Sequence, residues 1–272
     1  MTWLAGLVRL VHPAPTAAVT TLSAALALIL AEQAGGVPGW RVLLIVVAVL
    51  GSQILTGAHN DFVDRARDAR VQPTKPIPSR AVGSRAALRL AGAGGLLQLA
   101  ASIPLGPLTL VLGAAASGSA LGYNLWLSRT PASVVPYLVS FGLLPLWIAA
   151  GIGVDLERVA GASLLVGPFA AAAHLANTLR DFDADAALGS RSLVQVIGRR
   201  RGLALAWGLA MGVGIAVGLA FLLSGRLTPL TGLLGTVGMV AVAQGFAGPH
   251  RLWIGMLVAA VAWTAAWASA SG

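Results

Sequence analysis

Two short acidic clusters dominate the polar chemistry of this chain. Six of its nine carboxylates fall within residues 60–68 and 177–185, and each cluster begins with an asparagine. Converging carboxylates repel one another unless a cation compensates them, and their hard oxygen ligands suit Mg²⁺ or Mn²⁺ better than zinc. Arginines and a lysine follow the clusters, and these cations suit the oxygens of a metal-bound diphosphate. The residue types therefore predict a site for a divalent metal and a diphosphate.

The spacing in both clusters is that of a helix at about 100° per residue. The first cluster places four ligand-type side chains within about 100° of one another on a continuing helix: Asn60, Asp61, Asp64 and Asp68. The second places three within about 80°: Asn177, Asp181 and Asp185, with His174 on the same side. Asp183 falls on the opposite side, so we expect it to lie outside the metal ligands if the helix continues that far.

The composition places these clusters in a membrane protein. Hydrophobic residues make up 57% of the chain and charged residues 10%, with a mean hydropathy of +0.84. Nine apolar segments approach the ~20 residues that a helix needs to cross a bilayer: 14–32, 42–60, 86–103, 107–126, 133–152, 159–180, 202–224, 227–246 and 252–270. Strand-type alternation is absent, so we predict an all-α, multi-span transmembrane helical bundle of nine helices that forms one domain over residues 1–272.

The basic residues predict how the bundle is oriented. If nine spans are laid down, 15 of the 18 Lys and Arg residues fall on the side of the amino terminus, and only Arg41, Arg158 and Arg226 fall opposite. The positive-inside rule then places the amino terminus and both acidic clusters in the cytoplasm. The first nine residues lack the features of a cleaved signal peptide, so we expect the first span to be retained. The net charge is +9, but the sequence contains no nucleic-acid-binding motif, so we expect no nucleic-acid partner.

Four elements resemble the UbiA superfamily of intramembrane prenyltransferases. Residues 60–68, with the sequence NDFVDRARD, resemble its NDxxDxxxD signature, and residues 75–79 resemble the K-P-I-P-S segment that follows it. Residues 123–129 are similar to the family's Y-x-x-x-L-K-R element, and Asp181 with Asp185 resembles the second DxxxD motif. The four elements occur in the family's order, so the resemblance covers most of the chain and implies a UbiA-like fold.

Three residues depart from the family pattern. Ser128 stands where the family often has Lys, Arg80 replaces the usual Gly after Pro-Ser, and His12 stands near the place of a common Arg before Pro. The missing Lys leaves one diphosphate contact to Arg129. Residues around the second motif look closer to the branch that acts on naphthoate-type acceptors than to the hydroxybenzoate branch.

The resemblance implies Mg²⁺-dependent transfer of a prenyl group from an isoprenyl diphosphate to a small aromatic or lipophilic acceptor, through an allylic carbocation. It implies two Mg²⁺ ions, with Mn²⁺ as the alternative metal. The implied catalytic and metal-binding carboxylates are Asp61, Asp64 and Asp68 for one ion and Asp181 and Asp185 for the other, with Asn60 and Asn177 in support. The implied substrate-binding residues are Asn60, Arg67, Lys75, Tyr123, Asn124, Arg129, Asn177, Arg180 and Arg191.

Two other functions use the same residue types. A membrane terpene cyclase would ionise the same donor in the same metal site and let the cation react with its own double bonds. A cation transporter would use the acids as an ion path, although transporters place such groups near the bilayer midplane. His59 and His174 are acid-base candidates or structural hydrogen-bond partners. The candidates to line the path of the prenyl tail, or to serve as packing residues and interfacial anchors, are Trp126, Tyr137, Phe141, Trp147 and Phe169. Donor length, acceptor, regiochemistry and oligomeric state do not follow from the sequence.

Overall fold

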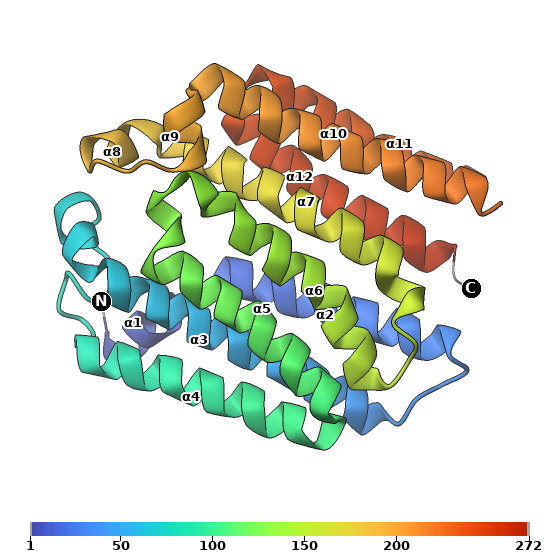
Figure 1. Cartoon of the computed structure of the whole chain (residues 1–272), viewed down its shortest axis with the longest axis horizontal. Helices are drawn as coiled ribbons and strands as arrows, with labels where there is room; N and C mark the ends of the chain where they lie inside the picture. Colours follow the sequence, from blue (N-terminus) through green and yellow to red (C-terminus); the bar gives the residue numbers. More distant parts are fainter. Residues whose placement is uncertain (1, 271–272) are drawn as a thin grey trace. The chain divides into compact units, whose positions relative to one another are not determined.

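The computed structural model describes residues 2–270, and this part of the chain is helical, without strands (Figure 1). Nine of its helical segments are long and apolar enough to cross a membrane: α2 (Pro13–Gln33), α3 (Gly39–Val71), α4 (Ser84–Ser102) with a 3₁₀ turn to Leu105, α5 (Pro107–Leu125), α6 (Val135–Ile152), α7 (Glu157–Arg180), α10 (Arg199–Leu223), α11 (Pro229–Ala243) and α12 (Pro249–Ser269). The predictions of an all-α fold and of nine spans are confirmed.

Short elements connect these helices. They are α1 (Trp3–Leu10), α8 (Phe182–Ala187), α9 (Leu193–Ile197) and the 3₁₀ turns Leu127–Arg129, Pro131–Val134 and Gln244–Ala247. The helices group into two compact units, one made of Met1–Ser128 and Leu143–Ala160, the other of Arg129–Gly142 and Gly161–Gly272. The first acidic cluster lies in the first unit and the second in the second unit. That the whole chain forms one domain stays a prediction.

Glycines allow α3 and α4 to pack closely in the first unit. A Cβ atom at Gly51 of α3 would lie only 2.7 Å from the carbonyl oxygen of Gly94 on α4, which leaves no room for a side chain. Small residues of this kind let the backbones of membrane helices approach one another. Buried hydrogen bonds join the same helices to α5: Ser117 lies 2.8 Å from Ser52 and donates to Gln98 at 2.9 Å. This packing holds the part of α3 that precedes the first acidic cluster.

The loop between α3 and α4 is held against α1. Leu10, Ala58, Val82 and Ala87 are buried together in one apolar cluster. A Cβ atom at Gly6 of α1 would lie 2.5 Å from the Val82 side chain, so α1 contacts the loop directly. The loop carries Lys75, and its packing therefore positions this lysine.

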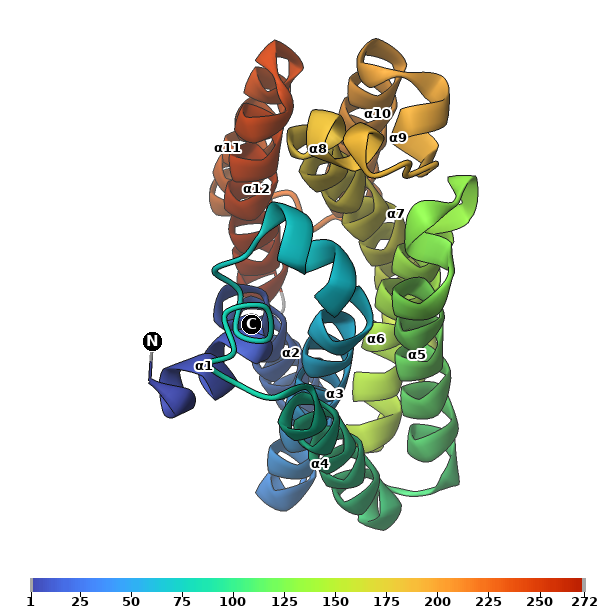
Figure 2. The ribbon, with the colours of Figure 1, turned by 90° about the vertical axis from the view of Figure 1, so that its left-hand side faces the viewer.

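The second unit is built around α7, α10, α11 and α12. Its buried core includes Leu175, Val242, Leu252 and Ala259, none more than 1% exposed. Helices α11 and α12 run side by side (Figure 2). A Cβ atom at Gly255 of α12 would lie 2.1 Å from the Ala241 carbonyl oxygen, so only glycine permits this approach.

Candidate active site

The first cluster lies on an unbroken helix, as its spacing predicts. At about 1.5 Å per residue the 33 residues of α3 measure about 50 Å, well beyond the ~30 Å hydrocarbon core. The helix therefore has length to spare, and its last turns carry Asn60, Asp61, Asp64 and Asp68. Asp61 and Asp68 are buried, with 3% and 5% of their surface exposed. The four predicted ligands share one side of α3.

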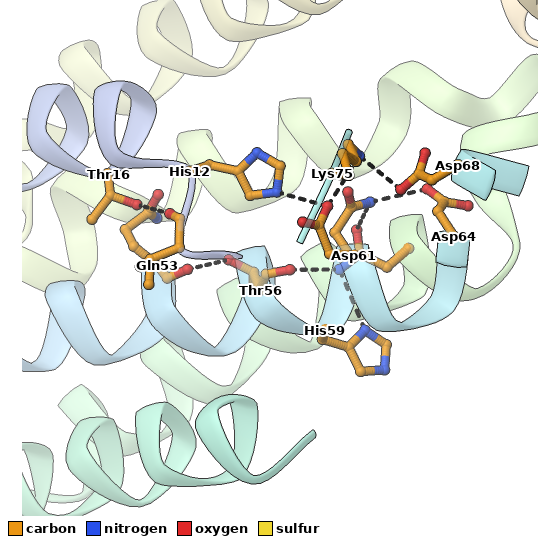
Figure 3. Close-up of polar contacts among 12 residues, drawn as sticks. His12, Thr16, Gln53, Thr56, His59, Asp61, Asp64, Asp68 and Lys75 are labelled. Carbon is orange, nitrogen blue, oxygen red and sulfur yellow. Dashed lines mark hydrogen bonds and ion pairs between the residues drawn. The ribbon is translucent and has the colours of Figure 1, made fainter. Parts of the chain in front are cut away.

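Lys75 joins the buried carboxylates of this face. Its Nζ lies 3.0 Å from Asp61 Oδ1 and donates to Asp68 Oδ2 at 2.8 Å (Figure 3). Burial by itself would lower the pKa of Lys75, but the hydrogen bond to Asp68 and the charges of Asp61 and Asp68 outweigh it and raise that pKa. The ammonium therefore stays charged and serves as the counter-ion of two acids that lie two helical turns apart.

The first cluster fits a divalent cation in donor chemistry and in charge. Carboxylate oxygens are the ligands that Mg²⁺ takes, and one positive group is already accommodated between Asp61 and Asp68. Within residues 2–270, no three His, Asp or Glu side chains converge as a ready-made metal centre. Asp61, Asp64 and Asp68 would thus hold a metal beside Lys75, which contacts two of these three acids.

His12 is a neighbour of Asp61 that the sequence reasoning missed. Its Nε2 lies 3.2 Å from Asp61 Oδ1, the same oxygen that Lys75 contacts (Figure 3). His12 precedes α2 with a φ of 52°, a left-handed conformation that is uncommon for residues other than glycine. The Thr16 hydroxyl donates to the Val11 carbonyl at 2.6 Å and secures this turn. The one signal for His12 was its place beside Pro13, where the family pattern has an Arg.

A hydrogen-bond network attaches the end of α5 to the first cluster. The Asn60 side-chain amide donates to the Asn124 side-chain oxygen at 3.1 Å and to Asp64 at 3.4 Å. Asn124 in turn donates to the Thr56 carbonyl at 2.9 Å and lies 3.4 Å from His59 Nδ1. The structure thus brings together the predicted residues Asn60, Asp64 and Asn124, and it gives His59 a contact with that network.

The helix breaks in the second cluster. Helix α7 ends at Arg180, and Asp181 is the residue that precedes the short helix α8, with φ −98° and ψ 13°. The assumption that one helix runs through this cluster is therefore wrong, and the helical phase of Asp183 no longer argues for or against a role. The Asp185 amide donates to the Asp181 carbonyl at 2.9 Å, so a hydrogen-bonded turn joins these two residues.

Asp183 has a partner at the surface instead. It forms an ion pair with Arg199, and its side chain is 88% exposed. The guanidinium of Arg199 lowers the pKa of Asp183 by its hydrogen bond and its charge. Arg199 also lies over the Phe182 ring, 4.6 Å from its centroid. That Asp183 is not a metal ligand stays a prediction, now supported by this pairing.

Other predicted substrate-binding residues gather within the second unit. The Arg191 amide donates to the Arg129 carbonyl at 3.2 Å, which places these two residues side by side. Arg180 lies over the Trp253 ring at 5.0 Å from its centroid, and Asn177 is exposed on α7 one turn before Asp181. Arg67 and Tyr123 belong to α3 and α5 of the first unit.

An aromatic stack lies one to two turns before the second cluster. Tyr137 and His174 stack with ring centroids 4.2 Å apart and planes 15° apart, and Phe141 lies 6.1 Å beyond Tyr137. His174 is buried, and the Thr178 hydroxyl donates to its carbonyl at 2.9 Å. His174 is therefore tightly packed against the candidate tail-lining residue Tyr137.

Comparison with known proteins assigns the chain to a family. Residues 18–251 match the model of the UbiA prenyltransferase family. The chain belongs to the UbiA prenyltransferase family. The resemblance found in its motifs is confirmed, and the chain is an integral, multi-pass membrane protein of a family of prenyltransferases.

The relatives of this chain are named for different activities. The chain is 30% identical to digeranylgeranylglyceryl phosphate synthase of Natronomonas pharaonis over 89% of this chain and 84% of that protein. It is 34% identical to 4-hydroxybenzoate octaprenyltransferase of Cupriavidus metallidurans over 61% of this chain and 58% of that protein. A UbiA homologue from Archaeoglobus fulgidus, solved with geranyl diphosphate (GPP) and Mg²⁺, shares the fold with a TM-score of 0.72, at 13% identity over 97% of this chain and 99% of that one.

One departure from the UbiA pattern lies at a special backbone position. Arg80 has a φ of 59°, a left-handed conformation that favours Gly. Glycine adopts this conformation without steric cost, whereas a residue with a Cβ atom is strained by roughly 1–2 kcal/mol. His12 and Arg80 are the two non-glycine residues with positive φ among residues 2–270. Both are basic and belong to the segments that flank the first cluster.

Proposed function

We propose that this UbiA family member catalyses the Mg²⁺-dependent transfer of a prenyl group from an isoprenyl diphosphate to a small lipophilic or aromatic acceptor. The observation that carries the proposal is the carboxylate face of α3, where Asp61 and Asp68 surround a positive group and Asp64 lies on the same side. Family membership supports it, as does the Archaeoglobus fulgidus homologue, whose structure contains GPP and Mg²⁺.

The residues of both motifs have complementary roles in this proposal. Asp61, Asp64 and Asp68, supported by Asn60, would hold one Mg²⁺, and Asp181 and Asp185, supported by Asn177, would hold a second; Mn²⁺ would substitute. Bound metal neutralises the diphosphate and makes it a better leaving group. The basic and amide side chains would bind the remaining diphosphate oxygens or orient the ligands: Arg67, Lys75, Tyr123, Asn124, Arg129, Arg180 and Arg191.

The chemical step is a substitution at an allylic carbon. The C–O bond of the donor breaks and its electron pair leaves with the diphosphate, which leaves an allylic carbocation. A nucleophilic atom of the acceptor then forms a bond to that carbon and loses a proton. The apolar helices keep water away from the cation, because water would otherwise capture it as an alcohol. Tyr137, stacked on His174, is a candidate to face the cation through its π electrons.

The experiment that tests this function compares the products formed with and without an acceptor. Purified protein is incubated with Mg²⁺ and geranyl, farnesyl or geranylgeranyl diphosphate, either alone or with candidate acceptors. We expect diphosphate release and a prenylated product only when a suitable acceptor is present. Rapid formation of a cyclic hydrocarbon from the donor alone would overturn transfer in favour of a terpene cyclase. Metal flux in liposomes, without binding of any prenyl diphosphate, would favour a transporter.

The acceptor panel follows from the two kinds of named relative. One arm uses a glycerol phosphate lipid that carries a single geranylgeranyl chain, and the other uses 4-hydroxybenzoate together with a dihydroxynaphthoate. The sequence around the second motif favours the naphthoate, whereas the relative with the larger coverage favours the glycerol phosphate lipid. The acceptor that gives the highest kcat/KM identifies the substrate class.

We further propose that the amino terminus and both motifs face the cytoplasm. The distribution of Lys and Arg, 15 of 18 on one side of nine spans, supports this orientation. Reporters fused to either end of the chain test it. Activity of a cytoplasmic reporter at the amino terminus and of an extracytoplasmic reporter at the carboxyl terminus is expected, and the reverse pattern would refute the orientation.

A further inference from the structure

A surface groove runs along the seam between α11 and α12 in the second unit. It has a volume of about 480 Å³ and is bounded by one face of each helix. On α12 the lining residues Arg251, Ile254, Gly255 and Val258 recur at helical spacing, so they share one face. Gly255 allows α11 to approach closely at the floor of the groove, because a side chain there would collide with the Ala241 carbonyl. The groove is thus a consequence of close helix packing.

The polar side chains of this groove that make no hydrogen bond or ion pair within residues 2–270 lie at one end. Gln244 and Arg251 are both exposed, and neither side chain makes a hydrogen bond or ion pair within residues 2–270. Together they offer amide and guanidinium N–H donors, and no carboxylate lines the groove. At the other end the Thr236 hydroxyl donates to the Gly232 carbonyl at 2.8 Å, so it needs no further partner. The groove therefore has a cationic, donor-rich end and an otherwise apolar length.

The length of the groove matches the depth of one membrane leaflet. From Thr236 to Gln244 on α11 the chain rises about 12 Å, and from Arg251 to Val258 on α12 about 10 Å. One leaflet contributes about 15 Å to a ~30 Å hydrocarbon core. The exposed side chains of Val237, Val240 and Val258 line this length. An alkyl chain that lies in the groove would begin at the level of Arg251 and run toward the bilayer midplane.

We propose that this groove binds a membrane phospholipid with a net negative headgroup, its phosphate held by Arg251 and Gln244 and one acyl chain lying between α11 and α12. Charge decides between this ligand and related ones. A single arginine matches one phosphodiester charge, whereas a prenyl diphosphate carries more charge and needs metal-binding carboxylates that the groove lacks. A zwitterionic headgroup would bring an ammonium with no carboxylate to receive it.

The groove is connected to the second acidic cluster through α12. Trp253, two residues after Arg251, lies against Arg180 of the second cluster on the far side of α12. A headgroup that fixes the first turns of α12 would therefore also steady the Trp253 ring on which Arg180 lies. The lipid is expected to support the arrangement of this cluster without taking part in the reaction.

The test measures phospholipid binding to the purified full chain. Delipidated protein in detergent is titrated with phosphatidylglycerol or phosphatidylcholine, and bound lipid is counted by native mass spectrometry. A photoreactive phosphatidylglycerol is then crosslinked and mapped by peptide analysis. We expect wild type to prefer phosphatidylglycerol by about fivefold, the equivalent of about 1 kcal/mol for one basic side chain near anionic lipid. Crosslinks should fall within residues 236–258.

Matched variants separate this site from general attraction between charges. R251Q should remove the preference, and R251K should keep it. R200Q removes an equal charge from the predicted cytoplasmic side of the same unit and should leave the preference unchanged. V258W fills the groove from α12, and V240W fills it from α11 if V258W does not fold; either should weaken binding of both lipids. An equal loss in R251Q and R200Q, or crosslinks outside residues 236–258, would overturn the proposal. Because the test measures lipid binding and not turnover, a negative result would leave the proposed prenyl transfer unaffected.

Discussion

The two acidic clusters have similar sequences but different structures. In the first, Asp61 and Asp68 are buried on an unbroken helix and share the ammonium of Lys75. In the second, the helix ends before Asp181, and Asp181 and Asp183 are exposed. The shared pattern of Asn, Asp and Asp at four-residue intervals therefore does not fix the backbone that carries it. The first cluster is held by buried contacts on one helix, whereas the second lies where α7 ends and α8 begins.

The basic neighbours account for much of this difference. Lys75 bridges Asp61 and Asp68, which lie two turns apart on α3, and so favours the helical arrangement of the first cluster. Near the second cluster the arginines have other partners, because Arg180 lies over Trp253 and Arg199 pairs with Asp183. Aspartates near a helix end also compete with the helix for backbone hydrogen bonds. Arg199 thus pairs with one exposed acid, whereas Lys75 joins two buried ones.

The largest expected effect is loss of turnover when a metal ligand is removed from either cluster. Asp64→Ala and Asp181→Ala should each lower kcat by at least ~100-fold, since each removes stabilisation of the charge that develops on the diphosphate. Turnover of radiolabelled donor measures this. Asp155→Asn, outside both clusters, is the control and should remain near wild type. A variant of either cluster with near-normal turnover would remove that cluster from the site.

The second expected effect tests the bridge that distinguishes the first cluster. Lys75→Met leaves Asp68 buried without the cation that it pairs with and leaves Asp61 beside His12, so it should lower the free energy of unfolding by about 1–3 kcal/mol when EDTA removes metal. Because a divalent cation replaces the lost charge, Mg²⁺ should restore more of the stability in this variant than in wild type. Thermal unfolding with EDTA and with Mg²⁺ measures both, and Lys75→Arg is the charge-preserving control. Equal stability of Lys75→Met and wild type in EDTA would show that the bridge contributes nothing.

A smaller effect is expected from the strained loop that carries Lys75. Arg80→Gly should stabilise the protein by about 0.5–1 kcal/mol, because glycine adopts the left-handed conformation without strain but gains freedom in the unfolded chain. Chemical denaturation measures the change. Arg80→Ala removes the same charge but keeps a Cβ atom, so it should be no more stable than wild type. If both variants gain stability equally, charge rather than backbone strain is the cause.

The smallest effect is expected at Asp183. Asp183→Ala breaks an exposed ion pair with Arg199, and such pairs contribute little, so turnover should stay within about threefold of wild type. The measurement is the same donor turnover used for Asp181→Ala. A loss as large as that of Asp181→Ala would place Asp183 among the ligands and show that the second cluster rearranges around its ligand.

Local signals in the sequence predicted the spans, because membrane-spanning length and apolarity are visible in a single window. The fourth segment, for example, was expected at 107–126, and α5 covers Pro107–Leu125. The continuation of α3 through the first cluster was also predictable from its spacing. The break at Asp181 was not, since the spacing there suits a helix equally well. The contact between His12 and Asp61 was not predictable either, because it joins segments that only the folded chain brings together.

Both acidic clusters are proposed to serve one reaction, and a double variant tests this proposal most directly. Groups that act as a unit lose nearly all of their effect when one member is removed. Donor turnover should therefore be as low in Asp64→Ala and in Asp181→Ala as in the variant that combines them. If the two losses instead multiply in the combined variant, or if one cluster can be removed without loss, the clusters act independently and the account is contradicted.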